Sequence, residues 1–316
     1  MQHLAHFRFW LLILIGVMLA ACGTSEYQKP IQTFSDATTL TQKSMHDYVD
    51  ALVQQVRENR IKEAAAKPAG VRFQEGDCLS DSTHCRIVLL KSKDDPNPRL
   101  LSLQQPIPKI LALMDAIKTY ADGLQAIATS DTGAKAEASL AAVGGSLQNL
   151  AQLLGEQGKT LSAFSEPAAA AVGWIAGEYI DSARLDALRI ATKDADPLIA
   201  QAVPIFEAAA KEVDIANRAA LAETVSERND DFRQNPSESS LNTLLSAAAA
   251  YDAVAGAAPD QVFRKLASSH AELTKALNDP ELSLASAFAE MDALKTEAEK
   301  LQKIVSAFIA AAQQKG

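Results

Sequence analysis

The chain has 316 residues, a formal net charge of −9 and 48% hydrophobic residues, so it can bury a sizeable core. Its acidity disfavours nucleic acid as a partner, because binding to phosphate backbones depends on Lys and Arg. It also disfavours broad adhesion to anionic lipid head groups. Aromatic residues make up only 5% of the chain. Small and aliphatic side chains must therefore dominate the core, which suits closely approaching helices.

The N-terminus has a weakly basic front followed by an apolar run over residues 9–21. This run is short for a membrane-spanning helix, which needs ~20 apolar residues, and it fits a secretory signal. It ends in Leu19-Ala20-Ala21-Cys22. That motif resembles the lipobox of bacterial lipoproteins, in which a branched apolar residue and two small residues precede a cysteine.

The resemblance implies that Cys22 receives a diacylglyceryl group and that signal peptidase II removes residues 1–21. A further fatty acid, such as palmitate, is often added to the new amine. Two or three chains hold firmly, since each buried CH₂ contributes ~0.8 kcal/mol. Gly23 stands where Asp would favour the inner membrane, so the family rule implies the outer membrane of a cell with two membranes, on its periplasmic or surface face. An ordinary cleaved signal with Cys22 near its end by chance is the alternative.

After Cys22, residues 22–30 are mostly polar and predict a flexible tether. Two further cysteines, Cys78 and Cys85, lie close together in the sequence. In an oxidising compartment such a pair predicts a disulfide. Zinc would need about four ligands, and only His84 lies nearby, so no metal is expected.

Periodic apolar positions predict helices over most of residues 31–316, which we interpret as one domain with a soft boundary at 227–235. The first helix is expected over 34–65, and two stripes over 110–127 and 140–154 predict an antiparallel helical hairpin. Proline or serine signals predict further helix starts near residues 167, 197, 237, 259 and 280. The stripe expected on the helix from 237 contains Leu241, Leu244, Leu245, Ala248 and Tyr251.

Residues 67–106 differ from the helical pattern. Short β-like runs at 71–73, 86–90 and 100–103 flank turn-forming residues, which predicts a small hairpin clamped by the Cys78–Cys85 disulfide. The segment is apolar for a connection, and it is also the least acidic part of the chain. We therefore expect it either to bind a protein partner in the cell envelope or to form a lid over one end of the bundle. The candidate partner surface consists of Phe73, Leu79, Arg86 and Arg99.

Catalytic motifs are not evident. The sequence has no Gly-x-Ser-x-Gly elbow, and His46 and His270 are predicted to lie on polar helix faces. Glu290, Glu297 and Glu299 could only form a glycosidase pair if a cleft brought them together. Because these acids alternate with lysines, a solvated helix face is the better interpretation. No catalytic residue and no cofactor are therefore expected.

Two glycine patterns concern packing. Residues 168–180 form an apolar stretch in which Gly173 and Gly177 flank Trp174. We interpret it as a buried central helix that another helix crosses closely, with a membrane-inserting segment of a pore-forming toxin as the alternative. Gly144-Gly145 lies within a helical pattern and is interpreted as a crossing point or kink.

These patterns together predict an all-α fold, an antiparallel multi-helix bundle with a small disulfide-clamped β-like hairpin insertion. The expected function is that of a lipid-anchored, non-enzymatic binding or structural module in the cell envelope. A membrane-active helical bundle and a cell-wall glycan hydrolase are the alternatives.

Overall fold

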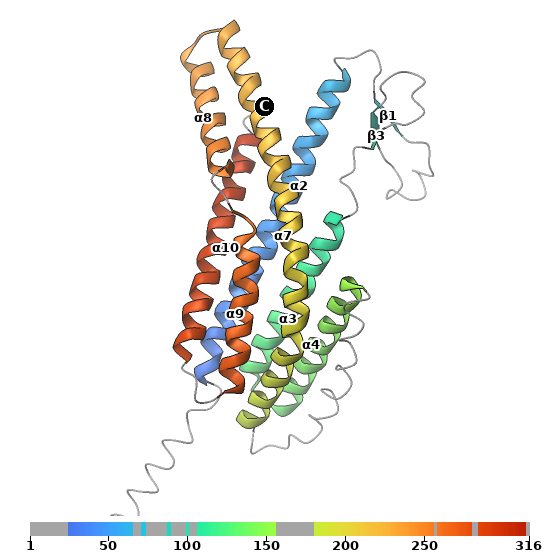
Figure 1. The fold of residues 1–316 in the computed structure, drawn as a ribbon, viewed down its shortest axis with the longest axis vertical. Coiled ribbons are helices and arrows are strands. Elements are labelled where there is room, and N and C mark those ends of the chain that lie inside the picture. The colour runs from blue at the N-terminus through green and yellow to red at the C-terminus, as the bar shows by residue number, and fades with distance from the viewer. Residues whose placement is uncertain are drawn as a thin grey trace, which may run out of the picture. The chain divides into compact units, whose positions relative to one another are not determined.

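The computed structural model describes residues 25–65, 71–73, 87–89, 99–100, 106–155, 180–255, 258–279 and 284–313. These residues form a helical bundle with three short strands (Figure 1). The helices are α2 (Ser25–Ala65), α3 (Pro106–Thr129), α4 (Gly133–Leu154), α7 (Ile180–Gln234), α8 (Glu238–Ala255), α9 (Gln261–Asn278) and α10 (Leu284–Gln313). The predicted helical fold class is confirmed.

The chain divides into two compact units. The described part of unit 1 consists of residues 25–39, 113–155, 180–204, 264–279 and 284–297. The remaining described residues belong to unit 2. The division within α7 falls after Pro204, whereas the predicted soft boundary at 227–235 lies almost wholly inside the helix. The polarity of that stretch reflects exposed helix surface and not a linker.

Helices α3 and α4 form the predicted helical hairpin in unit 1, and Figure 1 shows them side by side in green. Thr132 caps α4, with extended backbone and a side-chain oxygen that accepts from the Lys135 amide at 3.3 Å. Both predicted stripes are buried. They consist of Ile110, Leu113, Ile117, Tyr120, Leu124 and Ile127 on α3, and Leu140, Val143, Leu147, Leu150 and Leu154 on α4.

The close approach in this hairpin occurs at Gly123, not at the predicted Gly144-Gly145 pair. A Cβ atom added at Gly123 would lie 2.4 Å from Cγ2 of the buried Val143, whereas Cβ atoms at Gly144 and Gly145 would meet nothing within 4 Å. The predicted crossing point is therefore wrong, because the two consecutive glycines lie off the buried α4 stripe.

Alanine substitutions at these glycines should change stability in opposite directions. Gly123→Ala should destabilise the protein, because overpacking a core typically costs about 1–3 kcal/mol. The higher helix propensity of alanine offsets at most about 1 kcal/mol of this cost. Gly145→Ala, at an exposed position, should stabilise it by about 0.5–1 kcal/mol. Thermal unfolding of both variants is the test, and shifts of the same sign would contradict this assignment.

Helix α2 begins at Ser25, inside the segment that the sequence predicts to be a flexible tether. Tertiary contacts within unit 1 explain the difference. Gln28 Nε2 donates to the Ala128 carbonyl at 3.0 Å, while Ile31 and Phe34 are fully buried. Residues 25–30 are therefore ordered helix in spite of their polarity.

Helix α7 runs unbroken through Pro197, where the sequence predicts a new helix start, and it continues through Pro204. Proline inside a helix removes one backbone hydrogen bond and frees a carbonyl. The residues four positions earlier, Lys193 and Ala200, are exposed, so solvent can reach this side of the helix. The opposite side is anchored by buried residues, which are Ala195, Leu198, Ile199, Ala202 and Phe206.

The core of unit 2 combines small side chains with a few rings. Phe206 and Phe263 stack with centroids 4.8 Å apart, and Phe308 meets Tyr48 edge-on at 5.6 Å. Buried alanines occur on several of its helices, including Ala209, Ala220 and Ala247. This composition follows the low aromatic content of the chain.

The strands β1 (Val71–Phe73), β2 (Ile87–Leu89) and β3 (Arg99–Leu100) form a small antiparallel sheet in the order β1-β2-β3. They lie in or next to the runs that the sequence marks as β-like. Cys78 and Cys85 fall outside the described residues, so the disulfide clamp remains a prediction.

Candidate functional site

The residues predicted to form sites lie mostly outside the described ranges, as Cys22, Cys78, Leu79, Cys85 and Arg86 do. Phe73 and Arg99 are described at the backbone level. In the sheet register, Phe73 faces Ile87 across β1 and β2, and Arg99 faces Leu89 across β3 and β2. Because both residues pair with β2, the sheet brings two parts of the predicted partner surface together. The rest of that surface remains a prediction.

Helix α8 presents an apolar face that its own unit does not cover. Leu241 and Leu245 are 39% and 57% exposed, although large aliphatic side chains are usually buried. The buried residues of α8 are instead Ala247, Ala250 and Val254. At about 100° per residue these three lie roughly opposite the two leucines. The stripe predicted from the sequence is therefore wrong for Leu241 and Leu245, whereas its other members, Leu244, Ala248 and Tyr251, are half-buried at the edge of the core face.

Reciprocal hydrogen bonds fix the start of α8. The Ser237 hydroxyl accepts from the Ser240 amide at 3.1 Å, and the Ser240 hydroxyl accepts from the Ser237 amide at 3.0 Å. This arrangement resembles a capping box, which satisfies amides that a helix start leaves free. Leu241 follows directly, so the cap sets the direction in which the exposed leucines project.

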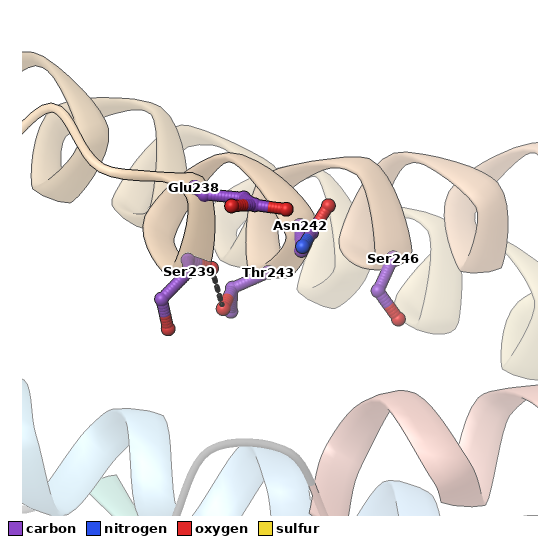
Figure 2. Close-up of a pocket in the computed structure, with 5 residues that line it drawn as sticks. All are labelled: Glu238, Ser239, Asn242, Thr243 and Ser246. Atoms are coloured by element: carbon purple, nitrogen blue, oxygen red, sulfur yellow. Dashed lines mark hydrogen bonds between the residues drawn. The ribbon is translucent and has the colours of Figure 1, made fainter.

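An open polar hollow of about 670 Å³ lies on the flank of α8 and is lined by Glu238, Ser239, Asn242, Thr243 and Ser246. Its Glu238 and Asn242 edge borders the leucine face, whereas Ser239 and Thr243 lie on the same helical row as the buried Ala247. Figure 2 shows the side chains of Ser239, Thr243 and Ser246 extending from the same side of α8. Thr243 Oγ1 donates to the Ser239 carbonyl at 2.9 Å. A polar margin next to exposed leucines is the usual composition of a protein interface, which has an apolar centre and a polar rim.

A second polar cluster lies in the core of unit 1, where His270 of α9 is fully buried. Its Nδ1 is 3.0 Å from Asp196 Oδ1, and its Nε2 is 2.7 Å from Tyr120 Oη. Because a carboxylate only accepts hydrogen bonds, Nδ1 carries a proton, and in the neutral imidazole Nε2 then accepts from the Tyr120 hydroxyl. The Phe34 ring packs 5.8 Å from the imidazole. The cluster therefore links α2, α3, α7 and α9.

No family model, curated protein or solved structure matches the chain. The geometry of the two clusters is therefore the basis for any functional assignment. Of these two clusters, the α8 surface is the one open to a partner, since His270 and Tyr120 are closed off from solvent.

The buried state of His270 corrects the sequence interpretation, which placed this residue on a polar surface. Its position could have been found from spacing. Leu266 and Leu273 lie on the core face of α9, and position 270 falls between them at helical intervals of four and three. The polar residue type obscured this signal.

Of the three glutamates considered as glycosidase acids, one connects two helices through hydrogen bonds, and the other two are exposed or half-buried. Glu290 accepts from Lys265 Nζ and from the Ser268 hydroxyl, both at 3.1 Å, and so ties α10 to α9. Glu299 is exposed, and Glu297 is half-buried. In the described ranges, no group of three or more His, Cys, Asp and Glu side chains is arranged to hold a metal ion. Among these same residues, no helix combines the length and apolar character needed to cross a membrane.

The buried tyrosines predict a loss of stability at alkaline pH. Burial raises the pKa of Tyr48 to about 12 and that of Tyr120 well above its usual value. Between pH 10 and 12 the folded protein therefore keeps protons that the unfolded chain has lost. This contribution to the stability of the folded protein is fully present below pH 10 and is lost as the pH rises to 12. For Tyr48, the loss in the free energy of unfolding is about 2–3 kcal/mol.

Urea unfolding at pH 8, 10 and 11.5 tests this expectation. Tyr48→Phe should make the free energy of unfolding fall less steeply above pH 10 than in the unchanged protein. Equal slopes for the two proteins would contradict the role of Tyr48.

Proposed function

We propose that this protein is a lipid-anchored component of the cell envelope, held to the membrane through Cys22, and that it acts as a non-enzymatic module that binds another protein. The exposed leucine pair on α8 is the observation that carries the binding role. The envelope location rests on the Leu19-Ala20-Ala21-Cys22 motif. In this proposal the outer membrane is the destination in a cell with two membranes.

The α8 surface has the features of a helix that fits a partner's groove. Leu241 and Leu245 are one turn apart on the same face, as are the anchor residues of amphipathic helices that bind in grooves. The two lining residues of the hollow that border the leucine face, Glu238 and Asn242, supply a polar rim. This rim favours a partner that offers hydrogen-bonding groups beside an apolar groove.

Site-specific crosslinking in living cells tests the binding role. A photoreactive benzoylphenylalanine at position 245 should capture one defined protein, whereas the same group at the exposed Gln148 of α4 should not. Leu241→Asp and Leu245→Asp should each weaken the captured complex at least about tenfold. Burying a leucine contributes ~1.5–3 kcal/mol, and 1.4 kcal/mol corresponds to a factor of ten.

Gln148→Asp is the matched control and should leave the complex unchanged. Equal capture at positions 148 and 245, or wild-type affinity in both leucine variants, would contradict a partner site on α8. Capture at position 73 or 99 would move the site to the sheet, as the sequence analysis predicts.

A further inference from the structure

A group of buried polar atoms in unit 2 has no role in the proposed binding surface. Tyr48 of α2 and Asn217 of α7 are 1% and 0% exposed, and Asp214 lies one turn before Asn217. The three residues are near neighbours. Burial has the largest effect on the Tyr48 pKa, a close side-chain approach of Asn217 as a hydrogen-bonding group lowers it, and the Asp214 charge raises it.

The approach of Tyr48 to Asn217 does not meet the distance and angle of a well-formed hydrogen bond, and by these criteria four atoms of this group have no hydrogen-bond partner in the described part of the chain. They are Tyr48 Oη, Asp214 Oδ1, and both Oδ1 and Nδ2 of Asn217. The other Asp214 oxygen is bound by Arg218 Nη2 at 2.5 Å. One turn before Tyr48, on the same face of α2, Ser44 Oγ is also buried without a partner. Since buried polar atoms in folded proteins are nearly always satisfied, such a concentration indicates a binding site.

The chemistry of these atoms specifies the ligand. Tyr48 and Asn217 can each donate and accept, whereas Asp214 can only accept. Arg218 balances the Asp214 charge, so the site favours a neutral molecule. The Phe308 ring packs edge-on against Tyr48 at 5.6 Å, and Phe308, Tyr48 and Asn217 are all buried, so a ligand enclosed here must be small. A water molecule both donates and accepts and typically makes about three hydrogen bonds in such surroundings.

We propose that Tyr48, Asp214 and Asn217 form an internal hydration site, in which ordered water links α2 to α7 by hydrogen bonds. Water donates to Asp214 Oδ1 and to Asn217 Oδ1, and accepts from Tyr48 Oη or Asn217 Nδ2. The contact between the two helices in this part of unit 2 is thereby polar and dependent on a shared ligand.

Substitution of Asn217 by the similarly sized Leu distinguishes this site from a dry cluster. With water present, Asn217→Leu removes one of its ligands and leaves Tyr48 and Asp214 poorly satisfied, so the melting temperature should fall by several degrees. In a dry cluster the same change would remove two unsatisfied atoms and raise the melting temperature. A rise would overturn the proposal.

Tyr48→Phe is a milder change that keeps the ring and so preserves the fold. Its effect on the melting temperature should be smaller in the Asn217→Leu background than in the unchanged protein, because the two side chains share one ligand. Full additivity would count against the site. A crystal structure of the full chain should show a water peak within about 3.2 Å of both Tyr48 Oη and the Asn217 amide, and empty density at a resolution that shows other buried waters would exclude it.

Discussion

His270→Leu should lower the free energy of unfolding by about 2–4 kcal/mol, more than the substitution of any exposed residue. The change removes the acceptor of the buried Tyr120 hydroxyl, which lies 2.7 Å from Nε2, and the donor that reaches Asp196. Leaving a buried polar group unsatisfied costs about 1–3 kcal/mol, and hydrogen bonds to charged groups add to this cost. Urea unfolding at pH 7 gives the value directly.

The double variant Tyr120→Phe/His270→Leu provides the internal control. Because both partners of the short hydrogen bond become apolar, it should recover part of the stability that His270→Leu loses. Gln148→Leu, at an exposed position of α4, should change the free energy of unfolding by less than about 0.5 kcal/mol. If His270→Leu were as stable as the unchanged protein, the cluster would not hold the helices of unit 1 together.

Cys22→Ser should abolish membrane anchoring by lipid and leave a larger, uncut precursor. The proposed modification occurs at the thiol, and signal peptidase II acts on the lipidated cysteine, so a hydroxyl at this position blocks both steps. Immunoblotting of whole cells should show only the precursor for this variant and the mature form for the unchanged protein. The matched controls Cys78→Ser and Cys85→Ser should be processed normally, and mature Cys22→Ser protein would contradict the assignment.

The sequence predicts the α3–α4 hairpin well because its information is local. Both stripes recur at intervals of three and four, and Thr132 lies directly before α4 with the side chain that a cap needs. Helix α7 could not be predicted in the same way. Pro197 is a helix-start signal in isolation, but packing of Leu198 and Ile199 keeps the helix continuous. Tertiary contacts decide that case, and a single sequence does not contain them in readable form.

The candidate site on α8 also could not be predicted from the sequence, because tertiary packing decides which of its residues are buried. In the sequence, Leu241 and Leu245 are among the most apolar residues of α8, and hydrophobicity alone places them in the core. The structure buries Ala247 and Ala250 instead, because small side chains let helices approach closely, and the leucines remain exposed. For His270 the residue type indicated the surface and the spacing indicated the core, and the spacing was correct.

Metabolic labelling with a clickable fatty acid tests the central claim of a lipid anchor most directly. The unchanged protein should carry the label, and the label should be lost in Cys22→Ser while Cys78→Ser retains it. Equal labelling of the unchanged protein and Cys22→Ser, or no labelling of either, would contradict anchoring through Cys22.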